Sequence, residues 1–181
     1  MNVSDSTTYF GLISRINHWF GALLVIILLG IGLYFHEMPK GDERSYWLGI
    51  HIGIGAVSFL LLAFRIIWRG INRHTQAAEQ AALAQKLSHI THALLLLAIL
   101  IMIITGPLII WTAARPINVF DLFSIPSPLP KMMELHEILE TIHKVTSRVL
   151  LVLIGVHVLA AIKHALITPQ VLAGRMWGRP N

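Results

Sequence analysis

The chain has 181 residues, of which 55% are hydrophobic and only 13% are charged, and its formal net charge is +5. Soluble domains contain about 45–50% apolar and about 25% charged residues, so this composition excludes a disordered chain and indicates an integral membrane protein. The sequence has no cysteine, which excludes disulfides, thiolate metal sites, a cysteine nucleophile and covalent c-type haem. The 10 histidines are therefore the main candidates for chemistry.

Four apolar stretches are long enough to cross a membrane: residues 11–35, 46–69, 87–111 and 139–167. About 20 helical residues cover the hydrocarbon core, and a helix satisfies its own backbone hydrogen bonds there. Tryptophans fall near the ends of these stretches, as membrane-interface residues do: Trp19, Trp47, Trp68 and Trp111. We predict an all-α fold, a single domain over residues 1–181 that forms an integral membrane four-helix bundle with up-down-up-down topology.

The positive charges predict which way this bundle faces. One side collects eight of them, namely Arg15, Arg65, Arg69, Arg73, Lys86, Lys163, Arg175 and Arg179. The other side collects six: Lys40, Arg44, Arg115, Lys131, Lys144 and Arg148. Because cytoplasmic loops carry the excess of lysine and arginine, we expect both termini in the cytoplasm.

Two of the connections have a distinctive composition. Residues 70–86 are rich in alanine, which favours a short helix at the cytoplasmic surface. Residues 112–130 form a long outer connection with prolines set between apolar residues. Because long loops without structure of their own are usually functional or disordered, we expect this connection to fold back over the bundle as a cap.

The fourth apolar stretch carries histidines at heptad spacing: His136, His143, His157 and His164. Seven residues make nearly two helical turns, so these side chains project from nearly one face. His143 and His157 are about 21 Å apart along a helix, too far to share one metal ion. Each can instead hold one of two stacked cofactors, whereas the alternative interpretation is a set of polar residues at the membrane interface.

Each such cofactor needs a second ligand on a facing helix. The alternating topology puts His18 level with His157 near the inner surface, and His51 level with His143 near the outer surface. Sites of this kind are typical of four-helix bundles. Two histidines make a poor zinc site, but they suit a haem, whose porphyrin provides the other four nitrogens.

Haem propionates need cationic partners. Arg65 follows His51 by 14 residues, so it lies on the same helix face about 21 Å further in, near the inner cofactor. We expect Arg65 to be a propionate partner there, and Lys144 and Arg148 are weaker candidates at the outer site. For each, the alternative is a cation that reaches the membrane interface with its charged end.

The chain resembles the bacterial cytochrome b561 family and the related cytochrome b subunits of membrane hydrogenases. The resemblance covers nearly the whole chain and rests on ISRINHW around His18, GIHIGIG around His51, SHITH with His92, and IHKVTSRVLLVLIGVH from His143 to His157. It implies two haem b groups, an inner one on His18 and His157 and an outer one on His51 and His143. It also implies that the inner side exchanges electrons with a quinone, ubiquinone being the expected one, and His92, Lys163 and His164 are the candidate quinone-side residues.

The resulting hypothesis is a di-haem cytochrome that carries electrons across the bacterial inner membrane, between the quinone pool and a small redox partner outside. Superoxide is one candidate for that partner, although acidic residues in the outer loops weaken attraction of an anion: Asp121, Glu134, Glu137 and Glu140. The alternatives are a subunit that anchors a hydrogenase or dehydrogenase, and a histidine-rich metal transporter. We expect contact with membrane lipid, a homo-oligomer as a possible assembly, and no nucleic acid partner.

Overall fold

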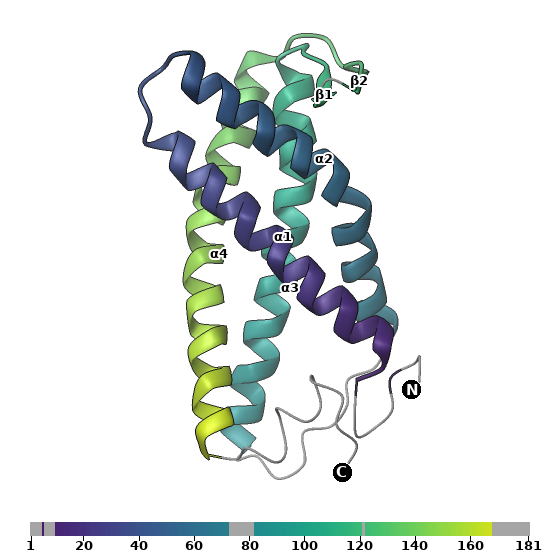
Figure 1. Cartoon of the computed structure of the whole chain (residues 1–181), viewed down its shortest axis with the longest axis vertical. Helices are drawn as coiled ribbons and strands as arrows, with labels where there is room; N and C mark the ends of the chain where they lie inside the picture. Colours follow the sequence, from purple (N-terminus) through teal and green to yellow (C-terminus); the bar gives the residue numbers. More distant parts are fainter. Residues whose placement is uncertain (1–4, 6–9, 73–81, 121, 168–181) are drawn as a thin grey trace.

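The computed structural model describes residues 5, 10–72, 82–120 and 122–167. It contains four long helices, α1 (Leu12–His36), α2 (Asp42–Ile71), α3 (Ala82–Thr112) and α4 (Met133–Ile167), and two short strands, β1 (Ile117–Val119) and β2 (Phe123–Ile125). The helices alternate in direction, and α1 and α2 are inclined to the more nearly parallel α3 and α4 (Figure 1). All four helices are long and apolar enough to cross a membrane, which confirms the predicted fold class.

The helices pack as two antiparallel pairs. The most extensive contacts join α3 to α4 and α1 to α2, while α2 and α3 connect the two pairs. A thin core runs through the bundle, with buried side chains from every helix: Val25, Leu62, Ala98, Ile99 and Leu150. Most apolar side chains point outward instead, and only 6% of the most apolar part of α4 is buried. This outward apolar surface suits contact with lipid.

Polar contacts join the start of α1 to the end of α2, at the end of the bundle that we call the inner end; the opposite end, with the hairpin, we call the outer end. The Asp5 carboxylate accepts a hydrogen bond from the Gly11 N–H and another from the Ser14 hydroxyl, both at 2.8 Å. The first of these satisfies a backbone donor just before α1, which a helix N-terminus otherwise leaves unpaired. The Trp68 indole donates to Ser14 Oγ at 2.8 Å, so that the start of α1 is tied to the end of α2.

The outer connection contains a β-hairpin that the sequence analysis did not identify. β1 and β2 pair antiparallel, with Ile117 opposite Ile125, and β1 packs mainly on α2. Phe120 lies at the turn with a φ of 50°, and its ring rests on Gly53 of α2, where a Cβ would come within 2.9 Å of it. Only a residue without a side chain allows this approach.

The expected surface helix at residues 70–86 lies partly outside the described residues. α2 continues to Ile71 and α3 already begins at Ala82, so that both ends of this segment belong to long helices. Residues 73–81 between them are not described.

Candidate functional site

Four histidines face one another in two pairs across the bundle. His18 of α1 and His157 of α4 have ring centres 6.2 Å apart, with an angle of 69° between the ring planes. His51 of α2 and His143 of α4 have ring centres 6.5 Å apart, with an angle of 84°. The structure thus brings together the residues that the sequence analysis paired by depth, and each pair joins α4 to a helix of the other antiparallel pair.

The spacing of the rings fits a metal ion between them. An imidazole nitrogen lies about 2 Å from a bound metal, so two imidazoles on opposite sides of one ion have ring centres about 6 Å apart. Among the described residues, no three histidine, aspartate or glutamate side chains gather into an all-protein metal site. The two imidazoles that each pair does offer suit a group such as haem, which brings four nitrogens of its own and binds histidine.

Glycines lie beside His51 and His143, which we call the outer pair. A Cβ on Gly32 of α1 would lie 3.3 Å from His51 Cε1, and one on Gly106 of α3 would lie 3.8 Å from His143 Cε1. His51 Nδ1 is buried without a hydrogen bond, with the backbone of Leu28 close to its ring. The missing side chain of Gly32 thus leaves room for the His51 ring, whereas a side chain at Gly106 would only make an ordinary contact with His143.

A threonine that the sequence analysis missed contacts the outer pair. Thr105 Oγ1 lies 2.7 Å from His143 Nδ1 and also 2.7 Å from the Ile101 carbonyl oxygen. The signal for it was present in the sequence, because Thr105 is an isolated hydroxyl inside the apolar third stretch. Polar residues in such positions are often functional.

Arg65 lies at the inner pair, His18 and His157, where the sequence analysis expected it. It donates hydrogen bonds from Nη1 to the Asn17 carbonyl and from Nη2 to His18 Nδ1, both at 3.0 Å. Gly21 makes room for it, since a Cβ there would lie 3.1 Å from Arg65 Cδ. Because a guanidinium only donates, His18 Nδ1 is the acceptor in this contact.

The three candidate quinone-side residues lie at different distances along the helices. His92 of α3 is next to the inner pair, with its ring centre 5.2 Å from that of His157 and its Nδ1 3.5 Å from Ser88 Oγ. Lys163 and His164 follow near the end of α4, where Lys163 is exposed and His164 is half-buried. The inner end thus has a third imidazole in contact with the pair.

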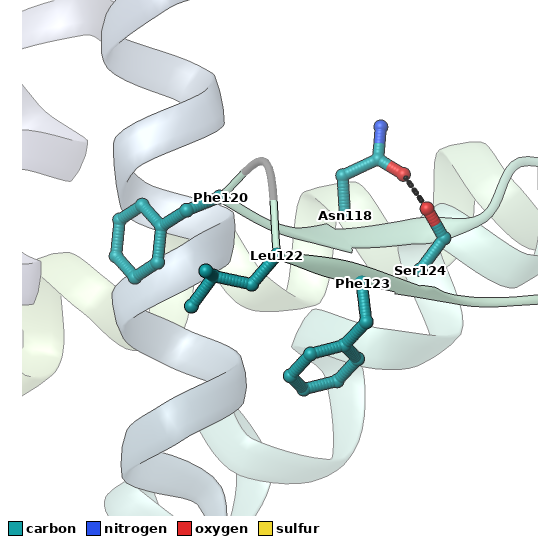
Figure 2. Close-up of a pocket in the computed structure, with 5 residues that line it drawn as sticks. All are labelled: Asn118, Phe120, Leu122, Phe123 and Ser124. Atoms are coloured by element: carbon teal, nitrogen blue, oxygen red, sulfur yellow. Dashed lines mark hydrogen bonds between the residues drawn. The ribbon is translucent and has the colours of Figure 1, made fainter.

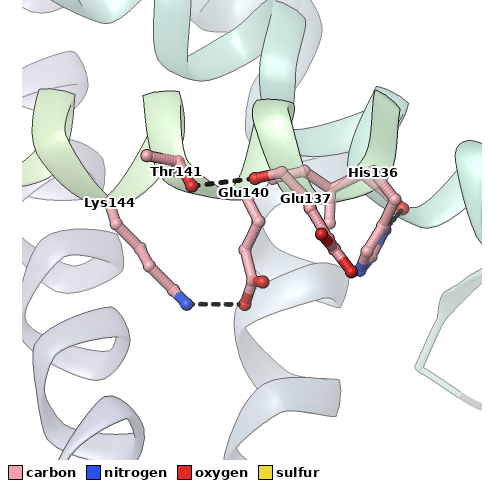
Figure 3. A network of polar contacts seen from close by, with 6 residues as sticks. His136, Glu137, Glu140, Thr141 and Lys144 are labelled. Atoms are coloured by element: carbon pink, nitrogen blue, oxygen red, sulfur yellow. Dashed lines mark hydrogen bonds and ion pairs between the residues drawn. The ribbon is translucent and has the colours of Figure 1, made fainter. Parts of the chain in front are cut away.

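The outer end of α4 carries a network of polar contacts (Figure 3). Lys144 and Glu140 form an ion pair at 2.8 Å, with each side chain about 40% exposed. His136 Nδ1 donates to the Ile109 carbonyl at 2.8 Å, which ties α4 to α3. Arg148, the other candidate for an outer propionate, is exposed.

A shallow hollow of about 410 Å³ lies at the hairpin, lined by Asn118, Phe120, Leu122, Phe123 and Ser124 (Figure 2). Ser124 donates to Asn118 Oδ1 at 2.8 Å on one side of it. None of the described residues that line this hollow is a histidine, and the hollow does not include either histidine pair.

Four helices able to span a membrane, with paired histidines facing one another between them, are typical of a membrane cytochrome of b type. The chain belongs to the prokaryotic cytochrome b561 family, whose sequence model matches residues 9–179. It is 26% identical over 186 residues to cytochrome b561 homolog 2 of Escherichia coli (strain K12), an alignment that covers 100% of this chain and 97% of the relative. The protein is thus a multi-pass bacterial membrane protein that binds haem b and transfers electrons, and the resemblance stated from the sequence is confirmed.

Proposed function

We propose that the protein is a di-haem cytochrome that carries electrons across the inner membrane, with both termini in the cytoplasm. The observation that carries this proposal is the pair of facing imidazoles at each end of the bundle, 6.2 Å and 6.5 Å apart. His18 and His157 would hold the inner haem, and His51 and His143 the outer one. When bound, the haems supply one-electron oxidation and reduction at two depths.

The protein's own part is to bind and shield these groups. Gly32 leaves space beside the His51 imidazole of the outer pair. Arg65 would hold an inner propionate, because a carboxylate is a stronger acceptor for a guanidinium than the neutral groups it contacts, the Asn17 carbonyl and His18 Nδ1. Leu150, which is halfway between His143 and His157 along α4 and is 3% exposed, belongs to the buried apolar core, and this core would keep water from the space between the two pairs.

Electron exchange with ubiquinone would take place at the end of the bundle that carries the inner pair, through the haem that these two histidines would hold. The contact of the inner pair with His92 supports this proposal, because histidine can donate to a quinone carbonyl and pass a proton near neutral pH. Lys163 and His164 would serve the same exchange further along α4. Replacing His92 by phenylalanine should slow oxidation of the reduced protein by ubiquinone while leaving its absorption spectrum unchanged. An unchanged rate would remove His92 from this role.

A small redox partner, for which superoxide is our candidate, would exchange an electron with the haem that the outer pair would hold. Two exposed cations on the outer connection would attract an anion, namely Arg115 and Lys131. Reduction of the oxidised protein by superoxide should slow as ionic strength rises. A rate that does not depend on salt would argue against this attraction.

One experiment tests the core of the proposal. The reduced-minus-oxidised spectrum of the purified protein should have the form of a b-type cytochrome with two histidine ligands, and haem analysis should give two haems per chain. A single haem per chain would refute the two-pair arrangement. Co-purification with a soluble dehydrogenase or hydrogenase would favour an anchoring subunit over a free-standing carrier.

A further inference from the structure

Thr105 is a buried residue whose hydroxyl contacts a histidine of the outer pair. Among the described residues, this histidine is the only polar side chain with which it forms a hydrogen bond. It lies in α3 and is 4% exposed. Its Oγ1 is 2.7 Å from the Ile101 carbonyl oxygen, 3.4 Å from that of Met102 and 2.7 Å from His143 Nδ1. The hydroxyl therefore links the backbone of α3 to an imidazole of α4.

The direction of these hydrogen bonds follows from counting protons. A threonine hydroxyl has one hydrogen and can accept through its lone pairs, while a carbonyl oxygen only accepts. The single hydrogen of Thr105 is therefore directed to Ile101, and the contact with His143 requires the imidazole to donate. His143 is then protonated at Nδ1, and its Nε2 keeps a free lone pair, the form that a metal ligand needs.

The inner pair has the opposite arrangement. Arg65 donates to His18 Nδ1 at 3.0 Å, so this nitrogen accepts and carries no hydrogen in that contact. The outer imidazole His143 thus has Nδ1 as a hydrogen-bond donor, as a metal-ligating histidine does, whereas His18 Nδ1 is an acceptor for Arg65.

We propose that Thr105 is a positioning residue for the outer haem: its hydroxyl, held by the Ile101 carbonyl, fixes the orientation and protonation of His143 and increases the electron density on its Nε2. This inference rests on the proposed function, in which His143 is an outer ligand. A hydrogen bond accepted from the second ring nitrogen makes a ligating histidine more basic, and loss of such a partner typically lowers metal affinity by about 10–100-fold. A more basic ligand also favours the oxidised iron and lowers the midpoint potential.

The test compares Thr105→Val, which keeps the shape but removes the hydroxyl, with Thr105→Ser, which restores it. Thr112→Val is the matched control, because Thr112 is also buried in α3 and bonds its hydroxyl to a carbonyl four residues back, at 2.7 Å from Leu108 O. Each variant is purified with its haem, and we measure haem per chain, haem retention on dilution into apomyoglobin and the midpoint potential of each haem. A His18→Ala background, which should lack the inner haem, assigns the outer signal.

Thr105→Val should lose its outer haem about 10–100-fold more readily and should raise the potential of that haem only, while Thr105→Ser and Thr112→Val stay close to the wild type. Wild-type retention and potential in Thr105→Val, or an equal effect of Thr112→Val, would overturn the proposal. If Thr105→Val does not fold, Thr105→Ala is measured in its place, because alanine favours the helix. Its retention of the outer haem and the midpoint potential of that haem are then compared with the wild type in the same way. A wild-type protein with fewer than two haems would refute the di-haem function itself, which distinguishes the two failures.

Discussion

Replacement of Gly53 by alanine should destabilise the outer end of the bundle. A methyl group at Gly53 would lie 2.9 Å from one carbon of the Phe120 ring and 3.1 Å from two others. These contacts are shorter than van der Waals separation, which is about 3.5–4.0 Å for carbon atoms. The ring and the hairpin that carries it would have to move away from α2.

Gly49 provides the matched comparison, since it lies one turn earlier in α2 and nothing is within 4 Å of a Cβ built there. Both replacements gain up to about 1 kcal/mol from the higher helix propensity of alanine. Only Gly53→Ala adds an overpacking cost, which is typically about 1–3 kcal/mol. We therefore expect Gly53→Ala to be less stable than Gly49→Ala by about that amount.

Thermal unfolding in detergent, followed by circular dichroism, measures this difference. A second set in the Phe120→Ala background completes a double-mutant cycle, and there the two alanine variants should be equally stable because the ring is absent. Proteolysis at the hairpin should also be faster in Gly53→Ala than in Gly49→Ala. Equal unfolding temperatures for the two variants in the wild-type background would refute the argument from the Phe120 contact.

Three further predictions concern the ends of the bundle. His143→Ala should halve the haem content and spare the inner haem, and loss of both haems from a folded variant would contradict the pairing. Arg65→Gln should weaken retention of the inner haem, and Arg65→Lys should restore it only in part because a lysine lacks the two-pronged donor; haem release rates would show whether it does. Lys144→Met should change the unfolding free energy by less than about 1 kcal/mol, because its ion pair with Glu140 is exposed; a larger loss in denaturant titration would mean that the pair is buried by lipid or a partner.

The helices and the histidine pairs could be predicted because each depends on a repeating pattern along one helix. Heptad spacing defined a face of α4, and the alternating topology then set which histidines share a depth. The ion pair of Glu140 and Lys144 could also have been predicted, because the two are four residues apart in a helix.

Other features depend on how elements far apart in the sequence are rotated against one another. The contact of Thr105 with His143 requires the rotation of α3 about its axis relative to α4, which the nearly uniform apolar surface of α3 does not specify. The hairpin was missed because its strands have only three residues each, too few for an alternating pattern to be recognised. Its position depends on the fit of Phe120 against Gly53, which is a contact between distant segments.

The arrangement of the helices as two antiparallel pairs has a consequence for assembly. Each histidine pair takes one imidazole from the α1–α2 half and one from the α3–α4 half, so a group bound by both imidazoles cross-links the halves. Such a ligand stabilises the closed bundle by an amount set by its concentration relative to its dissociation constant, about 2.7 kcal/mol at a hundredfold excess. In the proposed di-haem form, the cofactors would therefore help the thin protein core to hold the two halves together, and the bundle would resist opening most when both histidine pairs are occupied.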